Sequence, residues 1–162
     1  MSAIVVYDTS YGNTAVIAKA ICAGLGGDAV AREVETLDAS DLSKFDLLVI
    51  GSPTQSGRAT PSVRTWISQI PDGIVRHVRF AAFDTRLPMD GVLGVIMKVI
   101  GHAASRISHS LSSRGAIEVA PAEGFIVAGK AGPLAGSEEE RALAWGRSLA
   151  GASRTAGTDH QR

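Results

Sequence analysis

Hydrophobic and polar positions along the chain follow two alternating patterns. Short, largely apolar runs predict strands, and the all-apolar run at residues 3–7, rich in β-branched residues, suits a strand buried on both faces. These strand-like runs are residues 3–7, 29–34, 45–51, 77–83, 117–119 and 125–127. Between them, apolar residues recur every three or four positions, as on one face of a helix. The segments with this helical spacing are residues 13–25, 38–44, 61–70, 91–113 and 138–149.

Strands and helices therefore alternate along the whole chain, with no repeat or linker that divides it. This order predicts one α/β domain over residues 1–150, with a parallel sheet covered by helices on both faces. Residues 151–162 are polar, and we expect them to form a disordered tail. Ligands of parallel sheets bind beyond the carboxyl ends of the strands, where the strand order reverses. Long polar loops follow the predicted strands at residues 8–14, 52–60 and 84–91, so we expect a binding site where these loops meet.

The composition narrows the range of partners. With 162 residues, 45% of them hydrophobic and 20% charged, the chain has the size and composition of one globular domain. The formal net charge is zero, which argues against nucleic acid or an anionic membrane surface as a partner. No apolar run approaches the ~20 residues of a membrane span, and no signal-peptide pattern opens the chain, so we expect a cytoplasmic protein. The single cysteine, Cys22, and four scattered histidines predict neither a disulfide nor a metal site.

The first polar loop leads from a buried strand directly into a helix. The first backbone N–H groups of a helix lack internal partners, and the helix dipole places partial positive charge there. Hydroxyl groups at Thr9, Ser10 and Thr14 can donate to phosphate oxygens, and Gly12 permits a close approach of the backbone. The glycine spacing matches neither G-x-G-x-x-G nor G-K-[ST]. Taken alone, the loop fits two interpretations equally well. It is either a phosphate-binding loop or a simple turn in which Thr9 or Ser10 caps the helix.

Four segments of the chain resemble, in order, the flavodoxin family. TSYGNT at residues 9–14 resembles the family's phosphate loop for flavin mononucleotide (FMN). VIGSPTQSGRATPSV at residues 49–63 and AAFDTR at residues 81–86 are similar to its second and third flavin loops with their flanking elements. EGFIVAGKAGPLAGSEEERALAWGRSL at residues 123–149 is similar to its last strand and closing helix. The resemblance implies a three-layer α-β-α sandwich with a five-stranded parallel sheet of order 2-1-3-4-5, and FMN at the switch point between the first and third strands.

The resemblance also implies which residues bind FMN. The phosphate loop corresponds to Thr9, Ser10, Tyr11, Gly12, Asn13 and Thr14. The loop beside the flavin ring corresponds to Pro53, Thr54, Gln55, Ser56 and Gly57, and the loop on the pyrimidine side begins with Asp84, Thr85 and Arg86. In the family a backbone carbonyl of the second loop can turn to accept a bond from the reduced ring, which implicates the Ser56–Gly57 peptide. Asp84 and Arg86 are also spaced to pair with each other.

The chain departs from typical flavodoxins at the ring. Those proteins are acidic and flank the ring with aromatic residues, whereas this chain is neutral and offers Gln55 in one loop and Leu87, Pro88 or Met89 in the other. Arg58 and Arg86 are expected near the ring, where a positive charge stabilises an anionic reduced flavin and raises its potential.

We therefore expect an FMN-binding electron-transfer protein that acts as a redox carrier, without catalytic residues or metal ligands of its own. Its partners would be redox proteins or a small planar acceptor such as a quinone. Two alternatives remain. One is a quinone or porphyrinogen-type oxidoreductase with the same fold, and the other is a flavin-free module for binding or regulation.

Overall fold

The computed structural model describes residues 1–155, without the side chains of residues 99, 100 and 155. A six-stranded parallel sheet forms its centre, with neighbouring strands in the order β2-β1-β3-β4-β5 and β6 also paired with β4. The strands are β1 (Ala3–Tyr7), β2 (Val30–Glu33), β3 (Leu47–Pro53), β4 (Arg79–Arg86), β5 (Ile117–Glu118) and β6 (Glu123–Ile126). β5 pairs with the start of β4 and β6 with its end, so two short strands share the fifth position. The predicted order 2-1-3-4-5 is confirmed.

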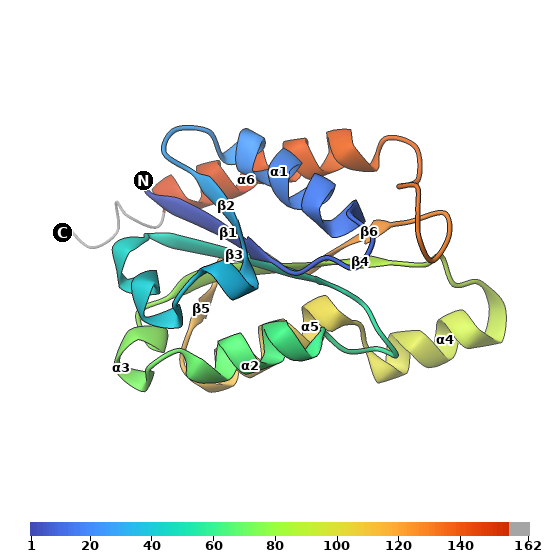
Figure 1. The fold of residues 1–162 in the computed structure, drawn as a ribbon, viewed down its shortest axis with the longest axis horizontal. Helices are drawn as coiled ribbons and strands as arrows, with labels where there is room; N and C mark the ends of the chain where they lie inside the picture. Colours follow the sequence, from blue (N-terminus) through green and yellow to red (C-terminus); the bar gives the residue numbers. More distant parts are fainter. Residues whose placement is uncertain (156–162) are drawn as a thin grey trace.

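The helices cover both faces of this sheet, which confirms the three-layer prediction. α1 (Asn13–Leu25) and α6 (Glu138–Thr155) lie above the sheet in Figure 1, and α2 (Pro61–Gln69), α3 (Asp72–Val75) and α5 (Ala103–Ser113) lie below it. The remaining helical segments are η1 (Val34–Thr36), η2 (Ala39–Lys44) and α4 (Gly91–Ile100). Asp38 caps η2 by accepting a hydrogen bond from the backbone N–H of Ser40.

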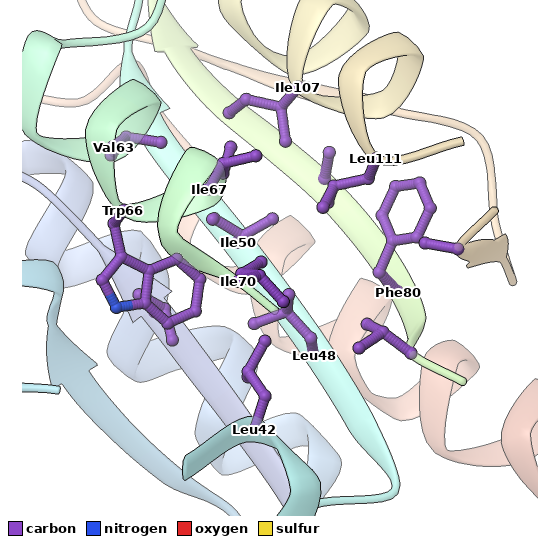
Figure 2. Close-up of a cluster of buried hydrophobic side chains, with 14 of the residues drawn as sticks. Leu42, Leu48, Ile50, Val63, Trp66, Ile67, Ile70, Phe80, Ile107 and Leu111 are labelled. Atoms are coloured by element: carbon purple, nitrogen blue, oxygen red, sulfur yellow. The ribbon is translucent and has the colours of Figure 1, made fainter. Parts of the chain in front are cut away.

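Each face of the sheet has its own hydrophobic core, which explains why the central strands have apolar side chains on both faces. Along β1, Ala3, Val5 and Tyr7 belong to the cluster under α1 and α6, whereas Ile4 and Val6 belong to the opposite cluster. Figure 2 shows this second cluster, in which strand residues meet α2 and α5; its members include Leu48, Ile50, Phe80, Val63, Trp66, Ile67, Ile107 and Leu111. Trp66 is thus a packing residue.

The single long helix predicted over residues 91–113 is wrong. The structure has two helices, because Gly101 adopts a φ of 87° and ends α4 before α5 begins at Ala103. α5 packs against β4 with Ile107 and Leu111 buried. α4 lies at the edge of the molecule in Figure 1 and leaves Val92, 78% exposed, and its apolar neighbours open to solvent. The spacing of apolar residues does not report the backbone conformation of a glycine. The sequence pattern therefore gave no sign that the helix ends at Gly101.

The closing helix is longer than the sequence predicts. α6 continues to Thr155, although residues 151–162 were expected to form a tail. Ser153 is buried, and its backbone carbonyl accepts a hydrogen bond from Nη1 of Arg79 at 3.2 Å. This long-range contact with β4 has no local sequence signal. Residues 156–162 of the predicted tail lie outside the described residues.

Glycines allow α1 and α6 to approach closely, and this contact provides a test of the packing. A Cβ at Gly146 would overlap the backbone carbonyl of Ile21. We expect Gly146→Ala to lower the free energy of unfolding by about 1–3 kcal/mol, because two helix backbones must move apart. Urea denaturation would measure this change. Gly151→Ala, in the same helix but with no atom within 4 Å of the added Cβ, should raise stability slightly. Equal effects of the two changes would contradict the packing explanation.

Candidate functional site

A cavity of about 500 Å³ lies at the carboxyl ends of the strands. It is formed where the loops after β1, β3, β4 and β6 meet, and so includes the switch point between β1 and β3. Its lining residues are Ser10, Tyr11, Asn13, Thr14, Pro53, Thr54, Gln55, Ser56, Thr85, Arg86, Leu87, Val127 and Lys130. Most of the sequence-predicted residues are therefore brought together. The exceptions, which do not line the cavity, are Thr9, Gly12, Gly57 and Asp84.

The first loop is shaped by its own hydrogen bonds. Oγ1 of Thr9 accepts a bond from the backbone N–H of Gly12 at 2.9 Å, and Gly12 adopts a φ of 89° immediately before α1. Because Gly12 is the N-cap residue, no side chain caps α1 in the described chain. The simple interpretation in which Thr9 or Ser10 caps the helix is therefore wrong. The first N–H groups of α1 keep their capacity to bind an anion at the cavity.

Hydrogen bonds connect this loop to the neighbouring ones. The hydroxyls of Thr14 and Thr85 bond to each other at 2.7 Å, and Thr14 is only 1% exposed. Nε2 of Gln55 donates to Oγ of Ser10 at 3.2 Å. The loops after β1 and β3, the start of α1 and the end of β4 are thus linked through side chains that line one cavity.

Residues 55–58 form a tight turn at the edge of the cavity. Gln55 and Arg58 exchange two backbone hydrogen bonds, of 2.8 and 3.0 Å. The two central residues, Ser56 and Gly57, have φ angles of 50° and 76°, which is the pattern of a type I′ turn. Gly57 adopts such an angle without strain, whereas Ser56 does so at some energetic cost.

Asp84 was predicted to begin a ligand-binding loop, but it lies on β4 and its side chain is completely buried. Its carboxylate accepts hydrogen bonds from Nε and Nη2 of Arg86, at 2.6 and 2.9 Å. It also accepts one from the backbone N–H of Ala104, in the first turn of α5, at 2.9 Å. The alternative that Asp84 and Arg86 pair with each other is confirmed. The strand continues to Arg86 because β6 pairs with it there, and Asp84 serves to orient Arg86 and to bind the start of α5.

The N-terminus of α5 points toward the same group of residues. Thr54 Oγ1 accepts a hydrogen bond from the backbone N–H of Ala103 at 3.1 Å, so the first two N–H groups of α5 are occupied by Thr54 and Asp84. His102 is the residue before this helix, and burial lowers its pKa. The nearby positive charge of Arg86 lowers this pKa further, whereas the negative charge of Asp84 raises it. We therefore expect His102 to be neutral at pH 7.

Sequence reasoning missed a fourth loop, which follows β6 and supplies Val127 and Lys130 to the cavity. The loop folds back on itself through an antiparallel bridge between Val127 and Leu134. It also packs so closely on the first loop that a Cβ at Gly132 would lie 2.7 Å from Oδ1 of Asn13. The sequence carried one usable signal, since GKAGP at residues 129–133 follows a strand whose carboxyl end lies at the same sheet edge.

A clamp at the start of α6 holds this fourth loop in place. Arg141 donates to both carboxylate oxygens of Glu138, at 2.9 and 2.8 Å, and pairs with Glu123 at 2.9 Å. Its guanidinium stands 4.4 Å from the ring centre of Phe125. Glu138 in turn accepts a bond from the backbone N–H of Ile126 at 2.7 Å. Both ends of the loop, at β6 and at α6, are thereby joined.

The clamp gives a pH-dependent prediction. Hydrogen bonds from Arg141 lower the pKa of Glu138, with the Ile126 N–H adding to the effect and burial opposing it. A carboxylate whose pKa is lower in the folded state stabilises the fold above its unfolded pKa, and this stabilisation is lost as the pH falls through the folded pKa. We expect Glu138→Gln to cost about 2 kcal/mol of unfolding free energy at pH 7. The difference from the parent should shrink toward pH 3, as measured by denaturant titrations at both pH values.

Glu139→Gln is the matched control, since Glu139 is exposed and adjacent in sequence. It should change stability by less than about 0.5 kcal/mol at either pH. A deficit of Glu138→Gln that persisted unchanged at pH 3 would show that packing, and not the charged clamp, explains it.

The described residues contain neither a membrane-spanning helix nor a cluster of metal ligands. Within residues 1–155, none of the helices has the length and hydropathy needed to cross a membrane. The same part of the chain contains no group of three or more His, Cys, Asp or Glu side chains arranged to hold a metal ion.

The chain shares its fold with solved flavoproteins at low sequence identity. A flavodoxin from the domain Archaea superposes with a TM-score of 0.77 at 18% identity, covering 95% of this chain and 99% of that one. Flavodoxin 1 from Bacillus cereus gives a TM-score of 0.71 at 17% identity, with coverage of 92% and 97%. The flavodiiron core of Flv1 from Synechocystis sp. PCC6803 gives 0.74 at 18% identity, covering 96% of this chain but only 36% of that protein. This chain thus spans about a third of the flavodiiron core and nearly the whole of the two flavodoxins.

Sequence comparison supplies the family. No curated protein matches the sequence. A family model described as a flavodoxin domain matches residues 4–86, which is half of the chain and includes the loops after β1 and β3 and all of β4. The strand order and the position of the cavity agree with this match. The chain therefore belongs to the flavodoxin family, whose members bind a flavin and transfer electrons.

Proposed function

We propose that this chain binds FMN noncovalently in the 500 Å³ cavity and works as an electron carrier. One observation carries the proposal: a helix N-terminus without a side-chain cap and the turn at residues 55–58 border the same cavity. The first suits a phosphate group, and the second suits a flat ring that must remain accessible at one edge. When bound, FMN supplies the one- and two-electron chemistry that side chains lack.

The phosphate subsite would be formed by the first loop together with the fourth. The hydroxyls of Ser10 and Thr14 and the amide of Asn13 border the cavity beside the start of α1. Lys130 adds a positive charge from the fourth loop, although the first loop contains no Lys or Arg. A phosphate dianion would therefore meet neutral donors, a helix dipole and one ammonium group.

The ring subsite would be formed by the loops after β3 and β4. Of the predicted residues that do not line the cavity, Thr9 and Gly12 would shape the first loop, Gly57 would shape the loop after β3, and Asp84 would hold Arg86 in position. Because Asp84 pairs with Arg86, the charge of Arg86 is largely balanced. It should raise the potential of a bound flavin less than an unpaired arginine would. Tyr11, 55% exposed, is the aromatic side chain that borders the cavity.

A second candidate is a quinone reductase, favoured by one feature of the ring side. Leu87 borders the cavity and is 42% exposed, so the ring would have an open apolar flank suited to a flat acceptor. Sustained quinone reduction with a nicotinamide donor would identify this activity. A carrier would instead be reduced or oxidised once and would require a redox protein as its partner. A cytoplasmic location and redox-protein partners remain predictions from the sequence.

The visible spectrum of the purified protein tests the proposal most directly. We expect flavin absorption bands, and quenching of FMN fluorescence when FMN is added to the flavin-depleted protein. A colourless protein that does not quench FMN would overturn the proposal and favour a flavin-free binding module.

A further inference from the structure

A second cavity, of about 350 Å³, opens between α2 and α5. Three arginines border it: Arg58 from the turn at residues 55–58, Arg64 from α2 and Arg106 from α5. Its floor is apolar and consists of Ala59, Ile67 and Ile107, each buried to at least 96%. We call this cavity the arginine cleft.

The arginine cleft concentrates positive charge in a protein whose formal net charge is zero. Among residues 1–155, Arg58 and Arg64 form no ion pair with a carboxylate. All three arginine side chains are exposed at the rim. Like charges gathered around a concave surface attract anions over several ångströms and accelerate their association. The cleft therefore favours a negatively charged occupant.

The turn at residues 55–58 separates the arginine cleft from the proposed flavin cavity. Gln55 and Ser56 border the flavin cavity, whereas Arg58 borders the cleft. Two backbone hydrogen bonds hold Gln55 and Arg58 together across this turn. A molecule that occupies the cleft would therefore sit beside the edge of the flavin cavity.

We propose that the arginine cleft is the docking site for an electron-transfer protein whose surface presents carboxylate side chains next to an apolar one. Guanidinium groups bind carboxylates through paired hydrogen bonds, and the floor of the cleft accepts the apolar side chain. A small anion bound in a dedicated pocket would be held by buried polar groups, whereas these arginines are exposed and suit an extended surface. Docking brings the partner's redox centre beside the flavin, and an electron passes between them without any bond being made or broken. This proposal rests on the proposed function.

Two variants of equal charge test the cleft. Arg58→Glu with Arg64→Glu reverses charge in the cleft, and Arg76→Glu with Arg147→Glu makes the same change at exposed positions elsewhere on the surface. The probe is a fluorescein-labelled peptide of sequence EELEE, and its binding is measured by fluorescence anisotropy at low ionic strength. We expect the cleft variant to bind at least tenfold more weakly than the parent, and the control to bind within about threefold of it. Equal loss in both variants would overturn the proposal, because overall charge alone would then explain binding.

A kinetic experiment connects the cleft to electron transfer. The FMN-loaded protein is reduced and mixed with ferricyanide or with tris(phenanthroline)cobalt(III), which carry opposite charges. The cleft variant should react about tenfold or more slowly with ferricyanide and faster with the cobalt complex, and 1 M salt should abolish both effects. Unchanged rates would show that the cleft does not steer partners toward the flavin.

The two experiments separate the possible failures. A protein that binds no FMN would contradict the proposed function. The peptide experiment needs no flavin, so it would still decide whether the arginine cleft binds carboxylates. If benzoate, a single carboxylate on a compact apolar body, binds the cleft as tightly as the peptide, the cleft is a small-molecule site and the docking proposal fails.

Discussion

Asp84→Asn is expected to lower the free energy of unfolding by about 3 kcal/mol, because it leaves a charged partner without its counterion. The Asp84 side chain is fully buried, and its carboxylate bonds to Arg86 and to the backbone N–H of Ala104. Arg86 is 24% exposed, so water solvates part of its unpaired charge. The loss of unfolding free energy should therefore be near the lower end of the range for a broken buried ion pair. The variant should also release Arg86 from its fixed position at the cavity.

Urea denaturation at pH 7 measures this change, and Asp72→Asn provides the matched control. Asp72 also pairs with an arginine, Arg114, at 2.9 Å, but its side chain is 80% exposed. An exposed ion pair contributes less than about 1 kcal/mol to the free energy of unfolding. Similar losses in the two variants would mean that Asp84 is not the buried structural group described above.

Thr14→Ala should weaken FMN binding by about tenfold to a hundredfold, the value of one hydrogen bond to a charged group. Riboflavin binding should fall much less, because riboflavin has no phosphate. Thr14 is 1% exposed and borders the cavity beside the start of α1. Fluorescence titrations of the flavin-depleted protein with each ligand give both affinities. Equal losses for FMN and riboflavin would show that this loop does not bind the phosphate.

Thr85→Val controls for the hydrogen bond between the two threonines. Thr14 and Thr85 bond to each other through their hydroxyls at 2.7 Å, and either substitution removes that bond. Thr85 lies near the end of β4, on the side of the cavity where we expect the pyrimidine side of the ring. Its loss should therefore affect FMN and riboflavin alike, whereas only Thr14→Ala should separate the two ligands.

The central elements were predictable because their causes are local. β1 is apolar throughout and β3 is apolar from Leu47 to Gly51, as expected for strands that are buried on both faces. Pro61 begins α2 as expected, with Thr60 as its N-cap. The polar loops after β1, β3 and β4 also follow from position, since the carboxyl ends of parallel strands meet at one edge. Most of the candidate site could therefore be located from the sequence.

The predictions that failed concern places where contacts with distant segments determine the local secondary structure. Residues 91–113 have helical spacing throughout, but α5 begins anew at Ala103, and its first N–H groups bond to Thr54 and Asp84. Thr54 is 49 positions away in the sequence, so no pattern within residues 91–113 reports this contact. Asp84 was placed in a loop for a similar reason, because the pairing of β4 with β6 extends the strand past it.

The sequence by itself determined the order of strands and helices, the burial of the central strands and three of the four loops that border the cavity. These depend on hydrophobic periodicity and on turn-forming residues, which act over a few positions. Only the tertiary structure decided that Asp84 turns inward to hold Arg86, that Lys130 reaches the cavity from the fourth loop, and that three arginines border one cleft. Each of these depends on packing between segments far apart in the chain. The chemistry of the site therefore depends on contacts between side chains that are far apart in the sequence, and local sequence patterns do not predict these contacts.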